Sequence, residues 1–354
     1  MGCRLDNNLY NDDIERSLSG IDFSSINGSR IMISGATGMV GSFIIDSLIK
    51  GVRDGVLSCE VIALGRSEEK ARARLPYFGE PYFSFESIDV SDPVIEIEHQ
   101  ADVVIHLAST THPRAYATQP IKTITSNING LQHLLQHAGL TSKSRFVFAS
   151  SVEVYGENRG DVELFDETYC GYLDCNTLRA GYPESKRLGE ALCQAYSAEK
   201  GQEVYIPRLP RTFGPTVLPT DTKAVSQFIS KAVTGDDIIL KSQGNQLYSY
   251  LYVADVSRAL LWMITKNLNG IAYNLASDSM NITLKDLAEK LAEIAKTQVV
   301  FKLPDEIESR GYSTATKAVM DGTLLSKTGW KPIFGLEESL EHTILVLKSI
   351  CEVQ

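Results

Sequence analysis

The chain has 354 residues, of which 43% are hydrophobic and 22% charged, and its formal net charge is −10. These values are typical of a globular enzyme with one or two domains. The negative charge argues against nucleic acid or an anionic membrane as the main partner, because both bind basic surfaces. No apolar run approaches the ~20 residues that span a bilayer, so we expect no membrane segment.

The six cysteines are scattered, with no CxxC pair and no His/Cys cluster at metal-ligand spacing. The opening residues also lack the basic and apolar regions of a secretory signal. Scattered thiols in a chain of this length indicate a reduced, cytoplasmic protein without a metal site.

In chain order, residues 1–28 are polar and predict an N-terminal extension. From residue 29, helical patterns alternate with short apolar segments, which are RIMIS, EVIAL, DVVIH, RFVFA and EVYIPRL. Buried strands that alternate with helices form parallel βαβ units. The sequence therefore predicts an α/β fold with a Rossmann-type, doubly wound parallel sheet over residues 29–214. The less regular alternation of residues 215–354 predicts a smaller, partly discontinuous C-terminal lobe that mainly binds substrate, with some segments returning to the sheet.

A glycine-rich turn follows the first expected strand, with Gly35, Gly38 and Gly41 in the segment SGATGMVG. Glycines at a strand–helix junction let the backbone approach a pyrophosphate, and the helix N-terminus offers free N–H groups. The turn therefore predicts a dinucleotide site, to which Thr37 and the neighbouring residues 39 and 40 (Met39 and Val40) would contribute.

The residues at the end of the second expected strand indicate whether the dinucleotide is NAD or NADP. An acidic residue there would accept the ribose hydroxyls of NAD, whereas an arginine suits a 2′-phosphate. The segment ALGRSEEK has no acid at the strand end and places Arg66 directly after it. We therefore expect NADP(H) in preference to NAD(H). Asp89 and Val90, at the end of a third strand, are candidates for the adenine edge.

A proton-transfer group is indicated by Tyr182 and Lys186, four residues apart on one expected helix. A nearby ammonium favours the phenolate of a tyrosine, whose free pKa is about 10. Ser151 ends a strand about thirty residues earlier, and its hydroxyl would bind the same substrate oxygen as Tyr182. Asn127 is expected at the adjoining helix.

Together these segments resemble the extended short-chain dehydrogenases/reductases. The motifs are the glycine turn, HLAS, SNING, SSVEVYG and YPESK, followed by RTFGP, YVADV and GWKP, over roughly residues 30 to 335. The resemblance implies an enzyme of a nucleotide-activated sugar with Ser151, Tyr182 and Lys186 as its catalytic residues. It also implies cofactor contacts from HLAS (Leu107, Ala108 and Ser109) and from Asn127, Tyr182 and Lys186, and a homodimer.

Within this branch the sequence looks most like UDP-glucuronate decarboxylases, which also carry a glutamate at the position of Glu153. The similar dTDP-glucose 4,6-dehydratases have an aspartate where this chain has Val152, and valine cannot donate a proton. Two arginines usual in the decarboxylases are missing, one of them replaced by Tyr248. Arg211 stands where those enzymes have asparagine, with Arg208 as the neighbouring alternative for binding an anion.

Glu153 has two interpretations. It would orient a sugar hydroxyl or act as a base next to C5, or it would hydrogen-bond to Arg179 at the rim of the pocket. His112, in the loop after a strand, is a further candidate for the sugar end of the site.

The expected reaction is reduction of an NDP-4-keto-6-deoxyhexose at C4, for example of the dTDP-linked sugar, in the synthesis of surface polysaccharides. Three alternatives stay open: a C4 epimerase, a decarboxylase of UDP-glucuronate, and a non-catalytic NADP-sensing protein.

Overall fold

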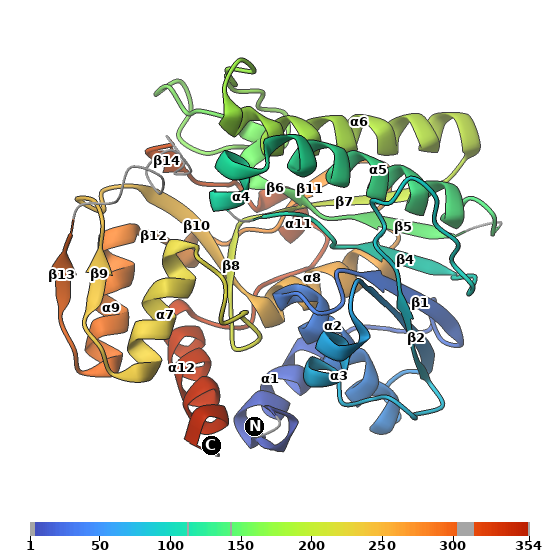
Figure 1. Cartoon of the computed structure of the whole chain (residues 1–354), viewed down its shortest axis with the longest axis horizontal. Helices are drawn as coiled ribbons and strands as arrows, with labels where there is room; N and C mark the ends of the chain where they lie inside the picture. Colours follow the sequence, from blue (N-terminus) through green and yellow to red (C-terminus); the bar gives the residue numbers. More distant parts are fainter. Residues whose placement is uncertain (1–3, 112, 142–143, 303–314, 353–354) are drawn as a thin grey trace.

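The computed structural model describes residues 4–111, 113–141, 144–302 and 315–352. Its main sheet has eight strands in the order β11-β7-β5-β4-β1-β2-β3, with β6 paired to β7 (Figure 1), and the pairings are parallel. The strands are β1 (Ser29–Ser34), β2 (Cys59–Gly65), β3 (Phe83–Ser87), β4 (Val103–His106), β5 (Arg145–Phe148), β6 (Ser150–Ser151), β7 (Glu203–Leu209) and β11 (Ala272–Asn274). The predicted α/β fold with a Rossmann-type parallel sheet is confirmed.

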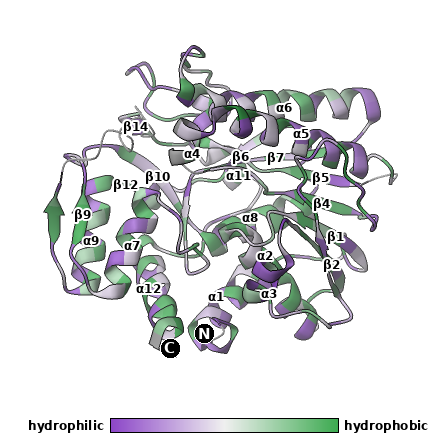
Figure 2. Cartoon of the chain, in the orientation of Figure 1, coloured by the Kyte–Doolittle hydropathy of each residue, from purple (hydrophilic) through white to green (hydrophobic). Residues whose placement is uncertain are grey.

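The central strands are mostly apolar, as expected for a sheet whose two faces are both covered by helices. Successive side chains of a strand point to opposite faces, and on β1 the side chains of Ile31 and Ile33 enter one core while Met32 enters the other. Figure 1 shows α5 and α6 over one face and α2 and α8 over the other, and Figure 2 shows hydrophobic colour along the strands between them. The helices of this layer are α2 (Met39–Arg53), α3 (Glu68–Arg74), α4 (Pro113–Thr118), α5 (Pro120–Ala138), α6 (Gly181–Lys200) and α8 (Val253–Thr265).

The strand order reverses at β1: β2 and β3 follow on one side of it, and β4, β5 and β7 are added on the other side. In open parallel sheets, ligands bind beyond the carboxyl ends of the strands at such a reversal. Gly35 follows β1 here, and Leu107 follows β4. The topology therefore brings the two predicted cofactor segments to the same edge.

A second layer of structure stands over this edge (Figure 1). Its four-stranded sheet has the order β12-β10-β14 with β8 paired to β10, and a two-stranded sheet joins β13 and β9. Its strands are β8 (Arg211–Phe213), β9 (Ile238–Leu240), β10 (Leu247–Tyr252), β12 (Asn281–Thr283), β13 (Val299–Phe301) and β14 (Lys317–Ala318). Its helices are α7 (Ala224–Thr234), α9 (Leu284–Ala295), α11 (Thr323–Ser326) and α12 (Leu336–Glu352). Two elements from after residue 214, β11 and α8, lie in the main sheet or against it.

The N-terminal extension forms η1 (Arg4–Asp6) and α1 (Asn8–Leu18), which packs against α2, α8 and α12. Figure 1 shows the two ends of the chain side by side. Asp13 on α1 is fully buried and accepts hydrogen bonds from Tyr252 of β10 at 2.6 Å and from the imidazole of His342 on α12 at 2.8 Å. The extension therefore ties the C-terminal lobe to the helix that carries the glycine turn.

One buried carboxylate anchors the extension. Asp46 of α2 is inaccessible to solvent and binds the Arg4 guanidinium in two places, at 2.6 and 2.9 Å. The hydroxyls of Tyr10 and Tyr77 also donate to Asp46. A buried charge is stable only when it is paired and hydrogen-bonded, so the carboxylate depends on Arg4.

We expect Arg4→Ala to lower the free energy of unfolding by about 3–5 kcal/mol, because it leaves the Asp46 carboxylate buried without its counter-ion. Urea denaturation followed by circular dichroism measures the change. Arg53→Ala is the matched control, because its pair with Glu80 is exposed and such pairs contribute only about 0–1 kcal/mol. Equal losses for the two variants would contradict this account of Asp46.

Candidate functional site

An elongated pocket of about 820 Å³ lies between the carboxyl edge of the main sheet and the C-terminal lobe. Its lining includes the residues predicted to contact the cofactor, which are Gly35, Thr37, Gly38, Met39, Val40, Gly41, Arg66, Asp89, Val90, Leu107, Ala108, Ser109, Asn127, Tyr182 and Lys186. It also includes the remaining predicted catalytic and substrate residues, which are Ser151, Glu153, Arg179, Arg211 and Tyr248. His112 lies outside the described residues.

The glycine turn is built for close backbone approach. Gly35 has a φ of +73°, and a Cβ there would lie 2.7 Å from the backbone nitrogen of Ala108. A Cβ on Gly41 would overlap the Gly35 carbonyl. Gly38 caps α2 without a side chain that could bond to the first-turn N–H groups, so these donors are left for an anion. The residues present therefore fit the pyrophosphate of a dinucleotide.

Hydrogen bonds that involve Thr216, at the start of the C-terminal lobe, hold this turn. The hydroxyl of Thr216 donates to the carbonyl of Met39 at 2.8 Å. Arg74 donates to the Thr216 carbonyl at 2.6 Å and to the hydroxyl of Ser42 at 3.1 Å. The glycine turn and the start of the lobe are thereby fixed to each other, a connection that the sequence did not predict.

The adenosine end of the pocket contains Arg66 and Asp89. Arg66 follows Gly65 at the end of β2, its side chain is 71% exposed, and its guanidinium lies 4.0 Å from the Asp89 carboxylate. Asp89 also accepts hydrogen bonds from the backbone and hydroxyl of Ser91. The guanidinium is therefore accessible at the end of β2.

The residues predicted to be catalytic come together where β6 and α6 meet. Ser151 ends β6, where its hydroxyl accepts a hydrogen bond from the backbone of Glu153, and both Ser151 and Tyr182, at the start of α6, line the pocket. Lys186 lies one turn further along α6, is buried, and donates to the Ala149 carbonyl at 2.7 Å. Asn127 of α5 bridges Ser109 at 2.9 Å and Ser185 at 2.8 Å, which fixes this helix against the segment after β4.

Burial sets the protonation of the two catalytic side chains. It raises the pKa of Tyr182 to about 12, an effect that the nearby Ser151 hydroxyl partly offsets. It lowers the pKa of Lys186 to about 8, because desolvation disfavours the ammonium. At neutral pH the phenol therefore carries its proton and is ready to donate it.

Two arginines lie at the sugar end. Arg179 forms an ion pair with Glu153 at 3.0 Å, as in the second interpretation of that carboxylate. The Arg211 guanidinium stacks on the Tyr248 ring, 3.3 Å from its centroid, and the Tyr248 hydroxyl is anchored to the carbonyl of Ala315 at 2.8 Å. Three of their guanidinium nitrogens are buried without a hydrogen bond, so this end of the pocket is suited to an anionic or polyhydroxylated ligand.

Tyr116 of α4 is a pocket residue that the sequence analysis missed. Its ring stacks on Tyr182 with centroids 5.0 Å apart, and Arg179 lies over it at 5.0 Å. An aromatic residue in the segment after β4 was a weak signal for it. Arg208, in contrast, does not line the pocket but forms a buried pair with Glu190.

Residues 31–276 match the NAD dependent epimerase/dehydratase family. The chain belongs to this family. UDP-glucuronic acid decarboxylase 1 of Danio rerio is 30% identical over 318 residues, which cover 89% of this chain and 72% of the relative. UDP-glucuronic acid decarboxylase 1 of Arabidopsis thaliana is 31% identical over 317 residues, which cover 89% and 69%. The resemblance inferred from the motifs is confirmed, and the chain is an enzyme of the superfamily that modifies nucleotide sugars.

Solved members share the fold at 20% identity. UDP-glucuronic acid 4-epimerase from Bacillus cereus, in complex with UDP-glucuronic acid and NAD, aligns with a TM-score of 0.75 over 91% of this chain and 99% of its own. The dTDP-glucose 4,6-dehydratase from Streptomyces venezuelae, with NAD and TYD bound, aligns with a TM-score of 0.76 over 90% and 97%. NAD is thus the dinucleotide in these neighbours.

Across the described residues, no group of three or more His, Cys, Asp or Glu side chains is arranged to hold a metal ion. Nor does that part of the chain contain a helix long and apolar enough to cross a bilayer.

We expect Gly41→Ala to abolish binding of the dinucleotide while the protein stays folded, because the new methyl group would displace the Gly35 carbonyl and open the turn. Fluorescence titration with NADPH and NADH measures the binding. Gly335→Ala is the control, because a Cβ at Gly335 meets nothing within 4 Å. Undiminished affinity in Gly41→Ala would contradict the assignment of this turn to the pyrophosphate.

Proposed function

We propose that the protein reduces the 4-keto group of a nucleotide-linked 6-deoxyhexose, with NADPH as the favoured reductant. The observation that carries the proposal is the buried phenol of Tyr182, which lines the pocket together with Ser151; its burial raises the pKa of the phenol and so favours the protonated form. A reduced nicotinamide, when bound, supplies hydride to the carbonyl carbon. Because reduced nicotinamide carries no ring charge, it leaves the phenol protonated, whereas an oxidation would need the phenolate first.

The side chains of this protein would bind the 4-keto oxygen and supply its proton. The Ser151 hydroxyl donates a hydrogen bond to the 4-keto oxygen, and Tyr182 transfers its proton to the same oxygen as the alcohol forms. Lys186 in its charged form then stabilises the resulting phenolate until solvent returns the proton. Water elimination is disfavoured, because the buried Val152 offers no acid and Glu153 is engaged by Arg179.

Decarboxylation of UDP-glucuronate is the second candidate. It is favoured by the relatives, which are UDP-glucuronic acid decarboxylases, and by Glu153, which those enzymes share by resemblance. In that reaction Tyr182 would act first as a base, and the free guanidinium edges of Arg179 and Arg211 would face the sugar carboxylate.

One assay separates the candidates. Purified protein is incubated with NADPH and a dTDP-4-keto-6-deoxyhexose, and separately with NAD⁺ and UDP-glucuronate. We expect loss of the reduced-nicotinamide absorbance in the first mixture only. Carbon dioxide release in the second mixture would replace the proposal with decarboxylation, and an epimer formed at constant cofactor oxidation state would replace it with C4 epimerisation.

In the active reaction we expect Tyr182→Phe to lower turnover by roughly a hundred- to ten-thousand-fold, the usual contribution of one positioned acid–base group. Steady-state kinetics measure kcat, and cofactor titration shows that the variant still binds. Tyr172→Phe, an exposed tyrosine, is the control. A turnover unaffected by Tyr182→Phe would support a non-catalytic protein or a different site.

We propose a preference for NADP(H) because Arg66 is exposed at the end of β2 where no acid stands. Arg66→Ala is expected to weaken NADPH binding about tenfold, the loss of one charge-assisted contact, and to leave NADH binding almost unchanged. Competitive titration with the two cofactors measures both affinities. Equal weakening of both would contradict a 2′-phosphate contact.

We also propose that the protein is a homodimer. Ile121 and Ile124 of α5 and Leu188 of α6 are exposed, and these two helices pack side by side on the outer surface of the sheet (Figure 1).

A further inference from the structure

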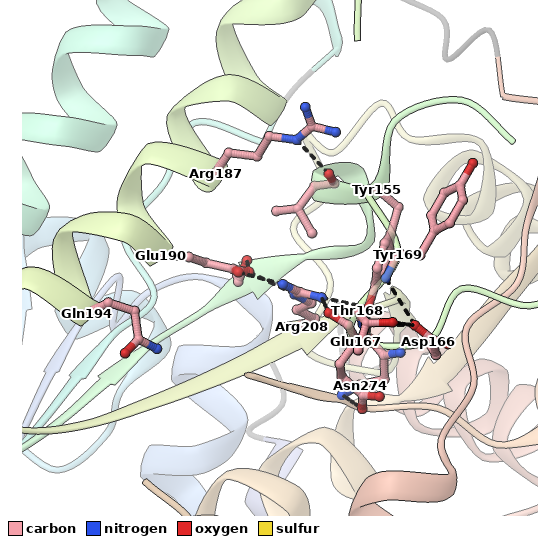
Figure 3. A network of polar contacts seen from close by, with 12 residues as sticks. Tyr155, Asp166, Glu167, Thr168, Tyr169, Arg187, Glu190, Gln194, Arg208 and Asn274 are labelled. Carbon is pink, nitrogen blue, oxygen red and sulfur yellow. Dashed lines mark hydrogen bonds and ion pairs between the residues drawn. The ribbon is translucent and has the colours of Figure 1, made fainter. Parts of the chain in front are cut away.

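A part-buried polar network connects Glu190 of α6, Arg208 of β7, Tyr155 and Asn274 (Figure 3). Arg208 of β7 binds Glu190 of α6 through two parallel contacts, 2.9 Å from Nε and 2.7 Å from Nη2. Its other terminal nitrogen donates to the Tyr155 hydroxyl and to the Glu167 carbonyl, both at 2.9 Å. Tyr155 in turn donates to Asn274 at 2.6 Å. The network therefore joins the catalytic helix to β7, to the segment after Ser151 and to β11.

Two members of the network adjoin the catalytic side chains. The hydroxyl of Ser150, the residue before Ser151 on β6, donates to the Glu190 carboxylate. Glu190 lies one helical turn after Lys186 on α6, so the two side chains share a helix face. The Glu190 carboxylate is thus a common neighbour of the strand that presents Ser151 and of the buried ammonium.

The charges in this region are few and nearly balanced. The side chains of Glu190 and Arg208 are only 15% and 12% exposed. Lys186 donates to the Ala149 carbonyl and lies over the Phe148 ring. The titratable groups that influence it are Glu190 and Cys193 on its own helix and His106 on β4.

Neither Cys193 nor His106 adds a charge near Lys186 at neutral pH. Burial raises the pKa of the Cys193 thiol and lowers the pKa of His106 to about 3. Tyr182 on the same helix also keeps its proton. Among these groups the Glu190 carboxylate is therefore the fixed charge that acts on Lys186, and the Arg208 guanidinium is paired with that carboxylate.

We propose that Glu190 and Arg208 are a charge-balanced pair of positioning residues, which hold the Ser151 strand against the catalytic helix and set the charge state of Lys186. Neither side chain lines the pocket, so both would act through the residues that touch the ligands. The proposal rests on the role given to Lys186 under the proposed function and adds what controls that lysine.

Single and double substitutions test the electrostatic part. Glu190→Gln removes an anion and leaves the Arg208 cation unbalanced, so it should lower the titration midpoint of Lys186. Arg208→Gln unbalances the carboxylate and should raise it. Charges one turn apart in a protein interior shift a pKa by roughly one unit. The double variant Glu190→Gln/Arg208→Gln should return the midpoint to within a few tenths of the wild-type value.

The midpoint is measured by NMR on protein labelled with ¹³C at the lysine Cε, titrated without any ligand, with Lys186→Met to assign the signal. Glu199→Gln, on the exposed end of α6, is the matched control and should leave the midpoint unchanged. Shifts of opposite sign with restoration in the double variant support the proposal. No shift, or shifts of the same sign in both single variants, would overturn it.

Ser150→Ala tests whether the network positions the Ser151 strand. It also keeps the proposal testable if one of the charge variants fails to fold. It keeps both charges, so the Lys186 midpoint should stay in place while kcat falls about tenfold and KM changes little, as expected for a slightly misplaced catalytic group. An unchanged kcat would overturn this part. Absence of turnover in the wild-type protein would count against the proposed function alone, because the NMR titration requires no substrate.

Discussion

The site depends on one buried cation. The ammonium of Lys186 is inside the protein, where its hydrogen bond to the Ala149 carbonyl joins α6 to the end of β5. Burying an ammonium is costly unless its donors are satisfied, and here a carbonyl, an aromatic ring and a carboxylate one turn away share that task. The same desolvation that lowers the pKa of Lys186 raises that of Tyr182, so one environment sets the chemistry of both.

The two halves of the molecule are joined by polar contacts at defined places. Thr216 and Arg74 fix the start of the C-terminal lobe to the glycine turn, and Asn274 connects β11 to Tyr155 beside the catalytic strand. The N-terminal extension is joined to β10 through Asp13, which accepts from Tyr252, and to α2 through Arg4, which binds Asp46. These connections are polar and buried, which makes the relative position of the cofactor and sugar ends a property of the whole chain.

The pocket around Tyr248, where we expect the sugar, differs by resemblance from that of the decarboxylase relatives. Tyr248 takes the place of an arginine by resemblance, yet the structure places the Arg211 guanidinium on the face of that tyrosine. A cation is therefore present near the expected position, but it comes from β8 instead of β10. Parallel pairing of Arg211 with Tyr250 explains this exchange, because neighbouring strands bring residues 211 and 248 together.

The sequence by itself determined the fold class and most of the pocket. Apolar strand segments, the glycine turn and the Tyr182–Lys186 spacing are local patterns, and local geometry alone decides what they form. Only the tertiary structure decided that Glu153 meets Arg179, that Tyr116 covers Tyr182, and that Arg208 pairs with Glu190 instead of lining the pocket. These contacts join segments distant in the chain, and side-chain charge and size do not reveal such partners until the sheet order has brought them together.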